Sequence, residues 1–226
     1  MTPPPTLALF DLDHTLLDGD SDVLWCEFLI DRGVLDRAVF GPRNRAIEAG
    51  YKAGAVGVLE FCEFYVGTLA SRSAVQWQPL REAFLEECIR PRVVPAGLAC
   101  IEQHRQAGHT LVLTTATNRF ITELTAAALD LPHLIATETE VAADGRFSGR
   151  VSGVPNMRQG KVTRLHAWLA ARGEAPLAQR PSVFYSDSIN DLPLLCAVRE
   201  AVAVDPDERL AAEAQARGWP VRHWRR

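Results

Sequence analysis

A short apolar run that ends in two aspartates is the feature that most constrains the fold of this chain. The run Thr6 to Phe10 reads TLALF, and Asp11 and Asp13 follow it in the segment DLDHT. A continuous apolar run of this length is typical of a buried strand in a parallel sheet. Carboxylates at the end of such a strand are costly unless a cation lies beside them. The segment therefore predicts a parallel sheet with a cation-containing site at the end of its first strand.

Beyond residue 90, short apolar runs alternate with amphipathic segments. The apolar runs are predicted strands, at 110–113, 134–137, 182–185 and 201–204. The segments beside them are predicted helices. They lie near 96–107, at 161–172 and at 207–217, and a further one follows the second strand and ends near 129. The pair Asp144-Gly145, between alternating segments, predicts a β-hairpin over 141–154. This order predicts an α/β fold, with a Rossmann-like doubly wound parallel sheet covered by helices on both faces.

The segment 21–90 has a different character, because its patterns are all helical. After a first helix that Ser21 and Asp22 can cap, further helical patterns follow; they lie near 36–52, 56–70 and 73–89. We therefore predict an all-helical insert at 21–90, placed after the first strand. The catalytic core is predicted to comprise 1–20 and 91–226.

Composition narrows the class of protein. The chain of 226 residues has a net charge of −4, which is not expected of a nucleic-acid binder. It lacks an apolar run of about 18 residues, so no membrane-spanning helix is predicted. Its five cysteines are scattered and form no C-x-x-C pair, which predicts reduced thiols in a cytoplasmic protein. Its six histidines form no cluster typical of a zinc site.

Polar residues follow three of the predicted strands. Asp11, Thr115 and Asp187 each come at the end of an apolar run. Ligands of open α/β sheets bind at the carboxyl ends of the strands, so we expect these side chains to converge. Asp11 and Asp13 could then act as nucleophile and proton donor, provided that their surroundings separate their pKa values. Two solvated aspartates in a turn are the alternative.

The other polar segments are ambiguous when each is taken alone. Asp187 and Asp191, in SDSIND, are spaced i,i+4 and are expected on one face of a helix start. This placement fits a functional site, and it fits simple capping of the helix N-terminus equally well. Lys161 begins a predicted helix, where a solvated lysine is the ordinary alternative. Hydroxyls that could cradle an anion after the second strand are those of Thr114, Thr115 and Thr117.

In combination and in this order, these segments resemble the four motifs of the haloacid dehalogenase superfamily. The closer resemblance is to its phosphoserine-phosphatase-like branch (subfamily IB), in which a helical cap lies between the first and second motifs. The insert at 21–90 matches that cap, and the segment DGRFSGRV resembles a hairpin of that branch. The resemblance implies a Mg²⁺-dependent phosphatase that hydrolyses a small phosphorylated metabolite.

The resemblance also implies a role for each motif residue. Asp11 would be the nucleophile that forms an aspartyl-phosphate, and Asp13 would protonate the leaving oxygen and then activate water. Thr115 would bind a phosphoryl oxygen, and Lys161 would neutralise charge on the phosphoryl group and on Asp11. The metal ligands would be Asp11, Asp187 and the backbone carbonyl of Asp13.

Three further residues of the fourth motif are expected around the metal and the phosphate. Asp191 would orient a metal-bound water or Lys161, and Asn190 and Ser188 could touch the phosphate or the metal's waters. The family usually has Gly-Asp-Ser in this motif, whereas Ser186 stands in place of the glycine here. This substitution is expected to be tolerated.

The second motif departs further from the family pattern. It is often Ser-Gly-Gly, but this chain has Thr115-Ala116-Thr117, so either Thr114 or Thr115 is the expected phosphate-binding hydroxyl. A substrate-recognising glutamate of phosphoserine phosphatases is replaced by Asp20. This shorter acid indicates a different amine or a larger substrate.

The cap is expected to set specificity, and its Arg43 and Arg45 could meet a substrate carboxylate or phosphate. Solvated helix arginines are the alternative.

The basic end VRHWRR is expected to be solvated. Esters of amino alcohols, such as phosphoserine or histidinol phosphate, are the substrates that the resemblance implies. The alternative functions are a phosphotransferase that uses an alcohol acceptor and a non-catalytic protein that binds a metal or phosphate. The sequence leaves the oligomeric state open.

Overall fold

A seven-stranded sheet forms the centre of the computed structural model, which describes residues 4–225. The strand order is β4-β3-β2-β1-β5-β6-β7. The strands are β1 (Leu7–Phe10), β2 (Thr110–Asn118), β3 (His133–Val141), β4 (Phe147–Ser152), β5 (Ser182–Ser186), β6 (Glu200–Val204) and β7 (Val221–Arg222). All neighbouring strands are parallel except β3 and β4, which form an antiparallel hairpin.

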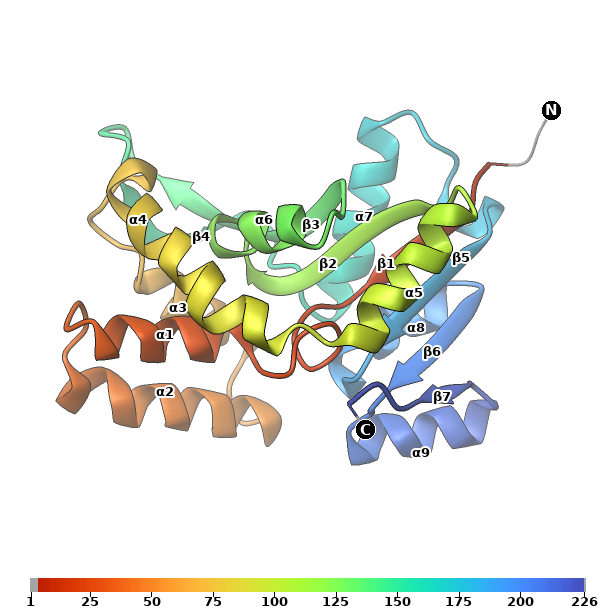
Figure 1. The fold of residues 1–226 in the computed structure, drawn as a ribbon, viewed down its shortest axis with the longest axis horizontal. Coiled ribbons are helices and arrows are strands. Elements are labelled where there is room, and N and C mark those ends of the chain that lie inside the picture. Colours follow the sequence, from red (N-terminus) through yellow and green to blue (C-terminus); the bar gives the residue numbers. More distant parts are fainter. Residues whose placement is uncertain (1–3, 226) are drawn as a thin grey trace.

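Helices cover both faces of the sheet (Figure 1). Ala8 and Phe10 of β1 pack in one apolar cluster with α5 (Pro95–Gln106) and α6 (Arg119–Ala128). Leu7 and Leu9 point to the other face, where the covering helices are α7 (Gln159–Ala171), α8 (Leu192–Ala197) and α9 (Glu208–Arg217). A strand that is apolar on both faces requires this double cover. The predicted Rossmann-like doubly wound fold is thereby confirmed.

The segment after β1 forms four helices that lie to one side of the sheet (Figure 1). They are α1 (Ser21–Asp31), α2 (Arg37–Lys52), α3 (Val58–Gly67) and α4 (Ala74–Phe84). A π-helical turn (Leu85–Ile89) and a 3-10 turn (Arg90–Arg92) then lead to α5. The hairpin of β3 and β4 reaches these helices, because Phe147 exchanges backbone hydrogen bonds with Ser71 and Arg72. We refer to 21–90 as the cap, and its status as a separate domain stays a prediction.

The structure adds to two of the sequence predictions about the sheet. The strand predicted at 134–137 and the hairpin predicted at 141–154 are both present, and they are joined, because β3 runs without a break into the hairpin. The side chains of the basic end are largely exposed, as predicted, but the segment is not a free tail, since β7 pairs with β6. The backbone N–H groups of Trp224 and Arg225 donate to Asp205, and the Trp224 ring stacks on Tyr185. Arg226 lies outside the described residues.

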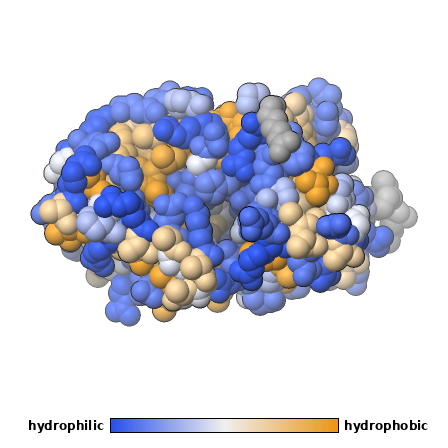
Figure 2. Space-filling model, turned by 90° about the horizontal axis from the view of Figure 1, so that it is seen from below, coloured by the Kyte–Doolittle hydropathy of each residue, from blue (hydrophilic) through white to orange (hydrophobic). Residues whose placement is uncertain are grey.

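Figure 2 shows a largely hydrophilic face, on which apolar side chains form small groups. Within residues 4–225, no helix combines the length and the apolar character that crossing a membrane requires.

Candidate active site

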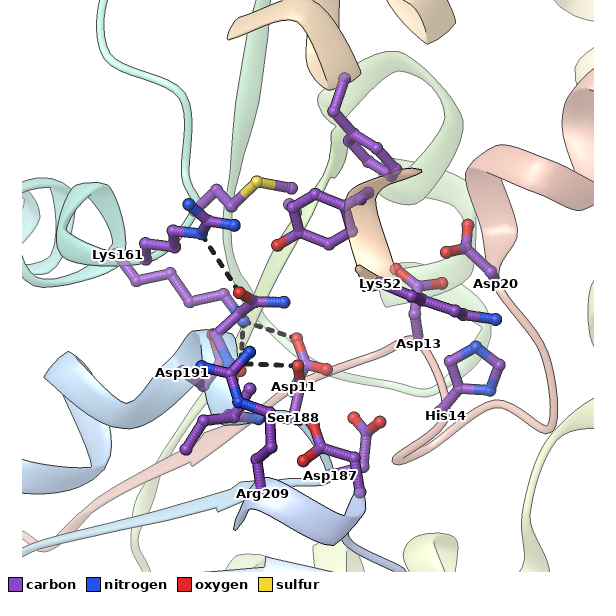
Figure 3. Close-up of a pocket in the computed structure, with 18 of the residues that line it drawn as sticks. Asp11, Asp13, His14, Asp20, Lys52, Lys161, Asp187, Ser188, Asp191 and Arg209 are labelled. Atoms are coloured by element: carbon purple, nitrogen blue, oxygen red, sulfur yellow. Dashed lines mark hydrogen bonds and ion pairs between the residues drawn. The ribbon is translucent and has the colours of Figure 1, made fainter. Parts of the chain in front are cut away.

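A cavity of about 410 Å³ opens at the carboxyl ends of the central strands. Asp11 lines it directly after β1 and Asp187 directly after β5, and Lys161 reaches it from the first turn of α7 (Figure 3). Of the three side chains that were expected to converge, Asp11 and Asp187 line the cavity, whereas Thr115 does not. The volume suits a small metabolite.

Lys161 forms the centre of the polar network in this cavity (Figure 3). Its Nζ lies 2.6 Å from Asp11 Oδ1 and 2.7 Å from Asp191 Oδ2, and all three side chains are buried. Burial by itself would lower the pKa of Lys161, but the two carboxylates outweigh it and raise this pKa above its ordinary value. Lys161 therefore stays charged. A glycine precedes it because a Cβ at Gly160 would lie 2.0 Å from the carbonyl oxygen of Pro155.

Asp13 is held by the start of the cap and by β2. Its Oδ1 accepts a hydrogen bond from the Ser21 N–H at 2.7 Å. Its Oδ2 accepts from the hydroxyls of Thr117 at 3.0 Å and Thr115 at 3.3 Å. Asp11 lies instead beside Lys161, so the two carboxylates of DLDHT have different partners. Such a difference is what a nucleophile and a proton donor need.

The threonines of β2 lie differently from the prediction. Thr114 turns away, since its hydroxyl accepts a hydrogen bond from Asn156 Nδ2 at 3.0 Å. Thr115 is fully buried, with its hydroxyl directed to Asp13. Ala116 and Thr117 form the cavity wall on this side. Thr117, one of the three threonines that the sequence indicated, reaches the cavity because β2 continues for several residues past its predicted end.

The fourth motif forms a tight turn and not a regular helix start. Asp187 precedes the turn and Asp191 ends it, so the prediction that they share one helix face is wrong. Ser188 begins the turn by accepting the Asn190 N–H at 3.2 Å, and both side chains line the cavity. Ser186, which replaces the family's usual glycine, donates its hydroxyl to Asp191 Oδ2 at 2.7 Å. Ser186 therefore helps to fix the carboxylate that holds Lys161.

Buried negative charge exceeds buried positive charge around Asp187. Its Oδ1 accepts from the Thr15 hydroxyl at 3.0 Å, and burial together with Asp191 raises its pKa to about 8. Burial and the neighbouring carboxylates also raise the pKa of Asp11 well above its ordinary value, although Lys161 opposes this. One lysine thus faces three buried carboxylates. A hard divalent cation with oxygen ligands fits this donor set.

No group of three or more His, Cys, Asp or Glu side chains between residues 4 and 225 is arranged to hold a metal ion. The predicted set needs only two carboxylates, from Asp11 and Asp187, with one backbone carbonyl. Mg²⁺ usually takes one or two protein carboxylates and keeps several waters, so this smaller set is compatible with it.

Residues of the cap and of the loop before it line one side of the cavity. They are Asp22, Tyr51, Lys52, Gly54 and Phe61, together with the predicted Asp20. Arg43 and Arg45 are exposed and do not line the cavity, and the Arg43 guanidinium lies 5.2 Å from the Phe64 ring centre. Their predicted contact with substrate is therefore not found. Only the C-terminal end of α2 reaches the cavity, and these arginines lie about two turns earlier.

Arg158 is a further cavity residue without a sequence signal. Its φ of +51° is unusual for a residue other than glycine. Its Nε donates to Asn190 Oδ1 at 3.1 Å, and its guanidinium lies 5.4 Å from the Tyr51 ring centre. Arg158 therefore connects the fourth motif with the cap.

Asp20 caps α1, a role that the sequence assigned to the residues after it. Its Oδ1 accepts the N–H groups of Asp22 and Val23, each at 3.0 Å. Burial and the nearby Asp13 raise the pKa of Asp20 to about 7. The second carboxylate oxygen has no part in these capping bonds.

The raised pKa of Asp20 predicts a pH-dependent stability. The folded protein keeps this proton up to a pH of about 7, whereas the ordinary value is 3.8, so the free energy of unfolding should fall as pH rises through this window. Asp20→Asn keeps the capping oxygen and should remove this part of the fall. Urea unfolding of both proteins at about pH 5 and about pH 8, without divalent cations, measures the effect. Equal falls in the two proteins would show that Asp20 does not titrate there.

Comparison with known proteins decides the family. The model of the haloacid dehalogenase-like hydrolases matches residues 8–195. The chain belongs to this family. This haloacid dehalogenase-like hydrolase is 38% identical over 215 residues to a histidinol-phosphatase of Neisseria meningitidis, covering 95% of this chain and 97% of that protein. It is 30% identical over 228 residues to a phosphoserine phosphatase of Mycobacterium tuberculosis, covering 96% of this chain and 70% of that protein.

Solved structures agree with this assignment. A Bordetella pertussis Tohama I protein of unknown function superposes on this haloacid dehalogenase-like hydrolase with a TM-score of 0.92 and 43% identity, over 98% of this chain and 99% of that one. A substrate-bound phosphoserine phosphatase superposes with a TM-score of 0.69 at 16% identity, over 98% and 94%, which shows the shared fold alone. The predictions of the family and of phosphatase as the enzyme class are confirmed by the family model and these relatives.

Proposed function

We propose that this chain is a Mg²⁺-dependent phosphatase that works through a phosphoryl group carried on Asp11. The observation that supports this most strongly is the pairing of the Asp11 carboxylate with a buried lysine at the cavity. A carboxylate nucleophile must be ionised and directed at the phosphorus atom. Lys161 favours the ionised form of Asp11, and Asp191 holds Lys161 in place.

The site would bind Mg²⁺ through Asp11, Asp187 and the Asp13 backbone carbonyl. When bound, the ion would supply positive charge that offsets the repulsion between phosphate and carboxylates. Asp11 would attack the phosphorus atom, and the bond to the leaving alcohol oxygen would break. Lys161 would stabilise the negative charge that spreads over the phosphoryl oxygens.

Asp13 is the proposed proton donor and acceptor. It would protonate the departing alcohol oxygen. Afterwards it would take a proton from the water that attacks the phosphorus atom, as the bond from phosphorus to the Asp11 oxygen breaks and inorganic phosphate leaves. Its three hydrogen bonds fix the carboxylate in one orientation, which proton transfer requires. The backbone near Ala116 would bind phosphoryl oxygens, while Thr115 and Thr117, whose hydroxyls donate to Asp13, would support that carboxylate.

The proposed substrate is a small phosphomonoester of an amino alcohol. Its support is the similarity to a histidinol-phosphatase over nearly the full length of both chains, and the carboxylates on the cap side of the cavity. The five cysteines are free thiols, which supports work in the reducing cytoplasm.

Phosphate release from a panel of phosphomonoesters tests the proposed activity. We expect release with Mg²⁺ and almost none with EDTA, and a preference for esters of amino alcohols over neutral esters. Acceptor alcohols in the same assay would reveal transfer to an alcohol in place of water. Release that is equally fast in EDTA would contradict the proposed role of the metal.

Metal removal should also change stability independently of turnover. With Mg²⁺ at about 100 times its dissociation constant, the free energy of unfolding should rise by about 2.7 kcal/mol, because the folded state alone binds the ion. Thermal unfolding with Mg²⁺ and with EDTA measures this difference. Asp187→Asn should abolish the Mg²⁺ effect, and an unchanged effect in that variant would exclude Asp187 as a ligand.

A further inference from the structure

Asp22 is a buried acid in the cavity that the proposed chemistry does not use. It lies in the first turn of α1, and its side chain is 3% exposed. Its Oδ1 is buried without a hydrogen-bond partner among the described residues, although Asp22 lines the cavity. Acids in the first turn of a helix usually lie at the surface, where water solvates them. An unpaired buried carboxyl oxygen is costly, which indicates a partner supplied by a ligand.

The surroundings of Asp22 favour a cationic ligand. Asp20 lies next to Asp22, since Asp20 Oδ1 accepts the Asp22 N–H at 3.0 Å, and Figure 3 shows Asp20 beyond Asp13, on the side away from Lys161. Burial raises the pKa of Asp22 well above its ordinary value, and Asp20 and Asp13 raise it further. An approaching cation would reverse this and let the carboxyl ionise. Two cations near this side of the cavity already have partners: Lys52 is paired with Glu48 at 2.6 Å, and the Arg158 guanidinium lies 5.4 Å from the Tyr51 ring centre and donates to Asn190.

Aromatic rings of the cavity wall also favour a cationic ligand. The rings of Tyr51 and Phe61 line the cavity, and their centres lie 4.4 Å apart. The faces of such rings attract ammonium and imidazolium groups. Carboxylates and ring faces together form a typical environment for an organic cation.

We propose that Asp22 binds the cationic nitrogen group, an ammonium or an imidazolium, of the phosphomonoester substrate. The inference rests on the proposed phosphatase function and adds the residue that selects the substrate. Asp20 would assist through the oxygen that does not cap α1. The phosphoryl group would lie at Asp11 and Lys161, and the cationic end would extend toward the cap. Asp22 is therefore a specificity residue and takes no part in bond cleavage.

Steady-state kinetics with three phosphomonoesters test this assignment. They carry a primary ammonium, an imidazole ring, or a neutral hydroxyl in place of the cation. Asp22→Asn keeps the shape of the side chain and removes its charge, so kcat/KM for the cationic ester that the site accepts should fall about 10- to 100-fold, mainly through KM. The kcat/KM for the neutral ester should change by less than about threefold. The two cationic esters show which nitrogen group the site accepts.

The matched control is Asp31→Asn, at the exposed end of the same helix, which should leave all three values unchanged. An equal fall for the cationic and neutral esters in Asp22→Asn would overturn the proposal and assign Asp22 a structural role. Unchanged kinetics for all three esters would overturn it as well.

Binding without turnover separates this inference from the proposed function. Calorimetry with a cationic and a neutral alkyl phosphonate of equal length should show tighter binding of the cationic one to wild type. That preference should be lost in Asp22→Asn. If wild type hydrolyses no ester but shows this preference, the phosphatase proposal fails while the Asp22 site stands. If both proteins bind the two phosphonates alike, the Asp22 site fails.

Discussion

Asp11→Asn should lower kcat for phosphomonoester hydrolysis by about 10⁴-fold or more, because the amide cannot act as the nucleophile. The variant should fold, since it removes one of the three buried carboxylates that face a single lysine. Its thermal stability in EDTA should equal or exceed that of wild type. Phosphate release with a large excess of enzyme measures the residual rate.

The control for this experiment is Asp144→Asn. Asp144 is exposed in the turn of the β3–β4 hairpin, and an asparagine there can still accept the Arg146 N–H. Hydrolysis by this variant should match wild type. Residual activity of Asp11→Asn within about tenfold of wild type would contradict the nucleophile assignment.

Lys161→Met should have the second largest effect, on both activity and stability. Without the ammonium group, Asp11 and Asp191 are left buried without their cation. Breaking a buried ion pair from one side costs about 3–5 kcal/mol of unfolding free energy. Activity should fall at least about 10³-fold, because the charge that stabilises the transferring phosphoryl group is lost. Urea unfolding and phosphate release measure the two effects.

A second substitution separates the stability effect from the catalytic effect. In Lys161→Met/Asp191→Asn one of the two carboxylates is neutralised, so part of the stability should return while activity stays low. Arg90→Met serves as the control, since Arg90 forms an exposed pair with Glu86 that is worth at most about 1 kcal/mol. Wild-type stability in the single variant Lys161→Met would contradict the geometry described here.

Much of the core fold can be predicted from the sequence because its strands are apolar on both faces. The run at β1 and the alternation after residue 90 specify a parallel sheet with two helical layers. Contacts made in three dimensions are harder to predict. β7 is a two-residue strand whose side chains are exposed, so it has no apolar pattern, and its place depends on pairing with β6 and on Asp205.

The site shows the same division between local pattern and tertiary packing. Asp11, Lys161 and Asp187 could be selected because motif order and strand ends indicate them. Asp22 and Arg158 could not, because an acid in a first helix turn and a loop arginine are common and usually solvated. The sequence offers Arg43 as a contact for the substrate, but α2 is oriented so that Arg43 does not line the cavity. That orientation depends on packing among the cap helices, for which a single sequence carries little signal.

The central claim is that Asp11 carries the phosphoryl group during turnover. Rapid acid quenching of the enzyme with substrate, followed by peptide mass spectrometry, tests it directly. The account predicts one added phosphoryl group on Asp11 itself, more abundant in Asp13→Asn because the water is activated slowly, and absent in Asp11→Asn. Phosphate release by wild type with no phosphorylated peptide, or with the phosphoryl group on another residue, would contradict the account.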